Sequence, residues 1–181
     1  MKKVVLFALC FFLLSNFSFS QVDLLTAKTR AQLVAQLDSA LRSKYFITQS
    51  EADKILEKPT FLKDSTYKLS SGLLRYSFTY VAKYVDSTSK GRLFFGIEQY
   101  KDTLAAKSNF EFLKKQNEKD GNLTTLKDLG DDAFLKKDAL NQPFVMIVEE
   151  NKIFKFQIFY LKTENSLNQL LLVAKKIVDT H

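Results

Sequence analysis

The hydrophobic and polar positions of this chain recur with two different periods, and the switches between them predict the order of its elements. From residue 24 to residue 44, apolar residues recur every three or four positions, which is the spacing of an amphipathic helix. A second, shorter helix is predicted from a capping-box pattern, with Thr48 at its start, Glu51 three positions later and Pro59 ending it.

Beyond this second helix the period falls to two residues, which predicts strands. Over 74–84 the apolar residues occupy even positions and mostly polar residues occupy odd ones, as in a strand with one buried face. Over 152–161 both faces are largely apolar, which indicates a central strand covered on both sides. Further strands are predicted over 61–69, 92–100, 133–136 and 144–149, and further helices over 103–118 and 166–178.

These elements predict an α+β fold. Because short turns join the strands, the sheet should be antiparallel, and the helices must cover at least one of its faces. We expect an antiparallel sheet of about five to six strands flanked by helices, with an additional N-terminal helix within 21–46 and one α+β domain over 47–181. The N-terminal helix can fold back on the sheet or dock on another protein, and strand 61–69 offers strand pairing if it lies at the sheet edge.

The first twenty residues have the pattern of a secretory signal peptide. Two lysines precede an unbroken apolar run over 4–14, and Ser18 and Ser20 supply small residues just before Gln21. The run is shorter than the roughly 20 apolar residues that cross a membrane as a helix. Cys10 lies in the middle of the run, unlike the cysteine of a lipoprotein signal. We therefore predict a periplasmic or secreted protein with no transmembrane segment.

Composition excludes most familiar catalytic chemistry from the exported chain. Of the 181 residues, one is cysteine and one is histidine, and removal of the signal peptide would leave no cysteine and only His181 at the C-terminus. Serine–histidine–aspartate triads, thiol nucleophiles and Cys/His zinc sites are therefore excluded. None of the five glycines has phosphate-loop spacing. We expect no enzyme activity, no catalytic residues, no cofactor and no metal.

Three tyrosines are candidates for ligand binding. Tyr76, Tyr80 and Tyr84 share one face of the strand over 74–84, an arrangement on which sugar rings, peptides or bases can stack. The alternative is that helices cover this face and the rings fill the core. The net charge of +7 is spread over lysine pairs without forming a basic stripe, so we do not expect nucleic acid as a partner.

Two aspartates form a second candidate site. Asp131 and Asp132 follow Gly130, and such a pair can bind Ca²⁺ or act as an acid and a base. The alternative is a turn in which Gly130 takes a positive φ and an aspartate caps the backbone.

Two stretches resemble a known type of domain. The segment Thr48–Pro59 is similar to the opening "T-x-x-E-A-x-x-I-L-G-x-P" of small exported bacterial domains, although Glu57 stands at their glycine position. The segment Asp128–Phe134 is similar to their "G-L-G-D-x-A-F" turn into a strand. Together with the strand order, over about 47–178, they resemble the PsbP-like α/β/α sandwich. The resemblance implies binding or assembly roles outside the cytoplasm and no catalytic residues.

The function that we favour from the sequence is an exported, non-enzymatic binding or assembly domain of unknown ligand. Two alternatives remain: a carboxylate-based extracytoplasmic hydrolase, and an inhibitor or protective partner of an exported protein. The expected partner is a protein or an envelope component, and the chain itself is expected to be a monomer.

Overall fold

The computed structural model describes residues 45–70, 73–83, 91–119, 121, 123–160 and 163–180. The chain from Tyr45 onward forms one compact unit. The predicted signal peptide and the predicted helix over 24–44 lie outside the described residues.

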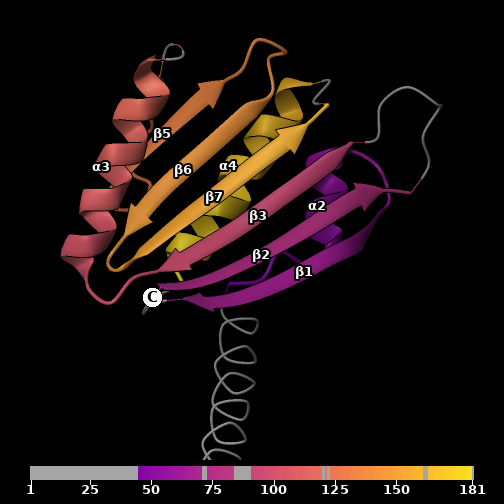
Figure 1. Cartoon of the computed structure of the whole chain (residues 1–181). Helices are drawn as coiled ribbons and strands as arrows, with labels where there is room; N and C mark the ends of the chain where they lie inside the picture. The colour runs from indigo at the N-terminus through magenta and orange to yellow at the C-terminus, as the bar shows by residue number, and fades with distance from the viewer. Residues whose placement is uncertain are drawn as a thin grey trace, which may run out of the picture. The chain divides into compact units, whose positions relative to one another are not determined.

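The described residues confirm the α+β class. The helices are α2 (Gln49–Leu56), α3 (Thr103–Lys119) and α4 (Glu164–Val178), and the strands are β1 (Thr60–Ser70), β2 (Leu73–Ala82), β3 (Arg92–Gln99), β4 (Leu123–Thr125), β5 (Asp132–Lys137), β6 (Pro143–Glu149) and β7 (Lys152–Phe159). Every pair of neighbouring strands is antiparallel, in the order β1-β2-β3-β7-β6-β5-β4 (Figure 1). The sheet thus has seven strands rather than the expected five to six, because the three residues of β4 are too few to show a period.

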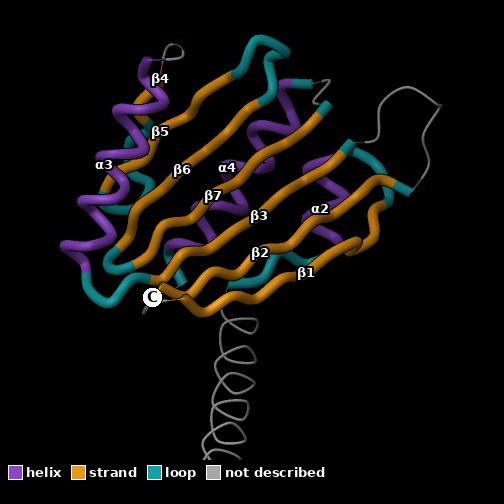
Figure 2. The backbone as a smooth tube through the Cα atoms, viewed as in Figure 1, coloured by secondary structure: helices purple, strands orange, loops and turns teal. Residues whose placement is uncertain are grey.

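The sheet separates two layers of helix. In Figures 1 and 2, α3 lies in front of the sheet, and α2 and α4 lie behind it. β7 is the central strand, as predicted, and β1 lies at the edge. The predicted half-buried strand is β2, whose even-numbered residues from Leu74 to Tyr80 are buried.

Local signals fix the start and end of α2. The hydroxyl of Thr48 accepts a hydrogen bond from the N–H of Glu51 at 3.2 Å, and the Glu51 carboxylate accepts one from the N–H of Thr48 at 2.8 Å. This is the predicted capping box. Glu57 ends the helix with φ 53° in the left-handed region, a conformation that glycine adopts most readily. Its carboxylate accepts hydrogen bonds from Thr163 and Asn165 at 2.8 and 2.7 Å, which ties α2 to the start of α4.

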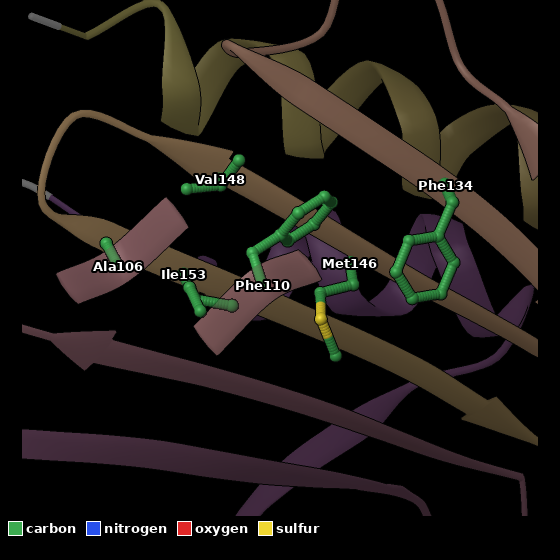
Figure 3. Close-up of a cluster of buried hydrophobic side chains, with 6 residues drawn as sticks. All are labelled: Ala106, Phe110, Phe134, Met146, Val148 and Ile153. Carbon is green, nitrogen blue, oxygen red and sulfur yellow. The ribbon is translucent and has the colours of Figure 1, made fainter. Parts of the chain in front are cut away.

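A compact apolar cluster holds α3 on the front of the sheet. Phe110 is 1% exposed, and its ring centroid lies 5.6 Å from that of Phe134 in β5 (Figure 3). The members of the cluster are Ala106, Phe110, Phe134, Met146, Val148 and Ile153. The cluster lies between α3 and strands β5, β6 and β7. α3 therefore covers only this side of the front face.

Candidate binding surface

The structure places the candidate tyrosines Tyr76 and Tyr80 in the core. Their side chains are 2% and 1% exposed and lie on the face covered by α2 and α4. Phe46 packs edge-on against Tyr80, and the Tyr80 hydroxyl donates a hydrogen bond to the carbonyl of Ile47. Burial, with a smaller contribution from the charge of Glu51, raises the pKa of Tyr80 to about 12. Neither ring offers a face to a ligand, and Tyr84 lies outside the described residues.

Asp131 and Asp132 are each paired with a different lysine of α3. Lys107 lies 2.9 Å from the Asp131 carboxylate, and Lys114 lies 2.7 Å from that of Asp132. Gly130 precedes them with φ 66°, and the Asp131 N–H donates to the carbonyl of Val148 at 2.9 Å. The two aspartates therefore join the start of β5 to α3. Within the described residues no group of three or more His, Cys, Asp or Glu side chains is placed to hold a metal ion.

The front of the sheet is uncovered on the side away from α3. No helix in the described part of the chain lies over the front of β1, β2 and β3 (Figure 1). We call this surface, together with Gln157 and Phe159 at the end of β7, the open face. Sequence reasoning missed it, although the polar odd-numbered residues of β2 already indicated that one side of that strand lies near solvent.

One end of the open face carries aromatic rings beside a cation. The strand register sets Val81, Arg92 and Phe159 side by side on neighbouring strands. The guanidinium of Arg92 lies over the Phe159 ring, 5.0 Å from its centroid. A cation over an aromatic face is attracted by the ring quadrupole. Both side chains are thereby held in place, with Arg92 exposed and Phe159 partly exposed.

Phe94 adds a second aromatic ring to the same surface. Two atoms of its ring lie 3.1 Å from where a Cβ on Gly96 would be, so the ring can rest on the β3 backbone only because residue 96 is glycine. On the side toward β1, the row that contains Gly96 continues with the small residues Ser77 and Thr66, whose hydroxyl oxygens lie 2.7 Å apart. Aromatic rings beside hydroxyl groups and a guanidinium suit binding through stacking and hydrogen bonds.

A charged network closes the other end of the open face, next to α3. The Glu98 carboxylate lies 2.9 Å from Lys155 and 3.1 Å from Arg75, and it accepts a hydrogen bond from the Tyr100 hydroxyl at 2.8 Å. Asn109 of α3 in turn donates to that hydroxyl at 2.5 Å. Burial raises the pKa of Glu98, but the contacts with Lys155, Tyr100 and Arg75 together lower it below its ordinary value. Burial and the neighbouring Glu98 raise the pKa of Tyr100.

We expect Glu98→Gln to lower the free energy of unfolding by about 1–2 kcal/mol near pH 7 and to weaken its dependence on acid pH. A carboxylate whose pKa is lower in the folded protein stabilises the fold fully above its unfolded pKa, here about 4.5, and loses that effect as the pH falls through the folded value. Urea unfolding between about pH 5 and about pH 3 should therefore show the two proteins converging.

Glu111→Gln is the matched control, because Glu111 is exposed on α3 and has no hydrogen bond or ion pair within the described residues. The control should follow the wild-type curve. A constant difference between Glu98→Gln and the wild type across the pH range would contradict the assignment.

Comparisons with known proteins found a similarity of fold and no similarity of sequence to a known family. No protein-family model and no curated protein matches the sequence. The structure is similar to the crystal structure of the extracellular domain of PknH from Mycobacterium tuberculosis, with a TM-score of 0.52 and 12% sequence identity, over 76% of this chain and 92% of that chain. Within the described residues, no helix is long and apolar enough to span a membrane. The described α+β arrangement is therefore similar to that of a domain that works outside the cell.

Proposed function

We propose that this protein is an exported, non-enzymatic binding or assembly domain and that the open face is its binding surface. The observation that carries the proposal is that the described elements leave this part of the sheet uncovered while it carries Phe94, Arg92 and Phe159. The signal-peptide pattern, the resemblance to PsbP-like domains and the likeness to an extracellular domain support a location in the periplasm or outside the cell.

The charges of the open face favour an acidic partner. The open face carries three cationic side chains, Lys68, Arg75 and Arg92, and two carboxylates, Asp64 and Glu98. A fourth cation, Lys155 of β7, borders it beside Glu98. An excess of one sign on a surface selects partners of the other sign and speeds their encounter. The proposed partner is therefore a protein or envelope component that presents acidic groups beside apolar ones.

The state of the acidic groups supports binding rather than hydrolysis. Asp131 and Asp132 are each held by a lysine, and Glu98 is held ionised by Lys155 and Arg75. A general acid needs a raised pKa so that it keeps its proton near neutral pH. The pKa of Glu98 is lowered, which is the opposite of what a general acid requires. We therefore favour the binding role over the carboxylate-based hydrolase.

Site-specific photo-crosslinking tests the proposed function. Benzoylphenylalanine in place of Phe94 should capture an envelope component in intact cells, and the same group in place of Leu172 should not. Leu172 is the matched control because it is 62% exposed and belongs to α4, behind the sheet. Adding Arg92→Glu should reduce capture at position 94 by about tenfold, because it reverses the charge of the open face beside Phe159.

Cell fractionation of the same cultures tests export. The chain should be found outside the cytoplasm and should begin at Gln21. Equal capture at positions 94 and 172, capture that is insensitive to Arg92→Glu, or a chain retained in the cytosol would each contradict the proposal.

A further inference from the structure

Within the described residues, the edge strand β1 has one side that no other strand pairs with. It is 11 residues long, and among the described residues it pairs only with β2. The strand at the opposite edge, β4, has only 3 residues. Unpaired N–H and C=O groups along a long edge are a template for another strand. Leu62 and Leu69 on β1 are 40% and 55% exposed, so this edge presents two large apolar side chains to solvent.

The charges on β1 select a second copy of the same strand. We propose that two copies of this chain pair through β1, antiparallel, about a twofold axis at Thr66. In this register Asp64 lies opposite Lys68 of the second copy, and Lys68 lies opposite Asp64 of the second copy. Neither residue has an ion-pair partner within the described residues of its own chain. Opposite charges at directly opposed positions stabilise an antiparallel pair.

Neighbouring registers lack this match. An axis at Asp64 or at Lys68 would set two like charges directly opposite each other, which destabilises strand pairing. An axis at Ser65 would place Asp64 opposite Thr66, and an axis one residue beyond Thr66 would place Lys68 opposite Thr66. Only the axis at Thr66 therefore forms both ion pairs.

Because of the β-bulge in β1, the register with its axis at Thr66 also places Leu62 opposite a leucine of the second copy. Leu62 is opposite Tyr80 and Asp64 is opposite Thr79, so Lys63 is the extra residue of the bulge. The bulge puts Leu62 on the same face of the sheet as Leu69, whose partner in β2 is Leu74. With a bulge in each copy, Leu62 comes opposite Leu69 of the second copy. The same register thus pairs charges on the front face and apolar side chains on the back.

A dimer formed in this way has closed twofold symmetry, and the sheets of its two copies join into one continuous sheet. A twofold axis at Thr66 is perpendicular to the sheet, because directly opposed residues in an antiparallel pair point to the same side. The two open faces would therefore lie on the same side of the joined sheets. The inference replaces the monomer expected from the sequence. It does not rest on the proposed function, because the pairing of β1 needs no partner bound to the open face.

Charge reversal on β1 tests the dimer in the chain lacking the predicted signal peptide. Sedimentation at low salt should show a monomer–dimer equilibrium. Asp64→Lys or Lys68→Asp alone should weaken it about ten- to thirtyfold, because each change turns two attractive pairs into two repulsive ones. The double variant Asp64→Lys/Lys68→Asp should restore wild-type affinity to within about threefold.

Matched variants on α3 and α4 control for general effects. Glu111→Lys and Lys115→Asp make the same reversals at exposed positions of α3 and should leave the dimer unchanged. Leu69→Glu should weaken the dimer, whereas Leu172→Glu on α4 should not. Circular dichroism checks that each variant is folded. A chain that stays monomeric at every soluble concentration, a dimer insensitive to the single reversals, or a double variant without rescue would each overturn the proposal.

Discussion

Phe156→Ala is expected to lower the free energy of unfolding by about 4 kcal/mol. Phe156 is fully buried in the central strand β7, and its ring stacks on that of Phe95 at 4.8 Å between centroids. Phe95 stacks in turn on Phe78 at 5.9 Å, which gives a row of rings across three strands. The backbone hydrogen bonds of β7 to both neighbours prevent the sheet from closing around the lost ring, so a cavity should remain.

Urea unfolding followed by circular dichroism and by tyrosine fluorescence measures this loss, and the two signals should change together. Phe159→Ala is the matched control in the same strand, because Phe159 is partly exposed on the open face. We expect it to cost no more than about 1 kcal/mol. If Phe156→Ala lowers the free energy of unfolding no more than Phe159→Ala does, the row of stacked rings does not stabilise the core as argued.

Gly130→Ala is expected to lower the free energy of unfolding by about 3 kcal/mol, from strain in the left-handed region and from overpacking. An added Cβ would lie 2.6 Å from Cγ2 of Ile147 and 2.7 Å from the carbonyl oxygen of Val148, and φ is 66°. The β6 backbone cannot move away without breaking its pairing with β5 and β7. The turn that carries Asp131 therefore has no room for a side chain.

Two further variants separate strain from overpacking: a control at Gly91, before β3, and a second substitution at Gly130. Gly91→Ala should change stability by less than about 0.5 kcal/mol, because the nearest atoms to its added Cβ lie at an ordinary 3.9 Å. Gly130→Asn relieves the backbone strain, since asparagine tolerates positive φ, but it keeps the clash with Ile147. If Gly130→Asn is as stable as the wild type, close contact is not the reason for glycine at this position.

Local patterns predicted the elements well because their causes are local. The alternation over 74–84 determines which residues of β2 share a face, and the capping box determines where α2 begins. The pattern does not say which face another element covers. Tyr76 and Tyr80 became candidates for that reason, and only the placement of α2 and α4 shows that they belong to the core.

Contacts between distant parts of the chain account for what the sequence did not predict. Asp132 pairs with Lys114, which lies on a helix that no local spacing connects to β5. The open face exists because α3 covers β5 to β7 and stops there, and the period of α3 does not show where it docks. β4 was not predicted because it has only three residues, and it forms a strand through its pairing with β5.

Contacts between the two halves of the chain join the two meanders of this domain. α3 follows β3 in the sequence, yet it packs on β6 and β7, and α4 follows β7, yet it packs on α2 (Figure 2). β3 also pairs with β7 in the middle of the sheet, so the two meanders share one sheet, and α2 and α4 form one helical layer behind it. The halves are interlocked, and loss of order in one should be transmitted to the other, which makes the domain a single cooperative unit despite its two separate meanders.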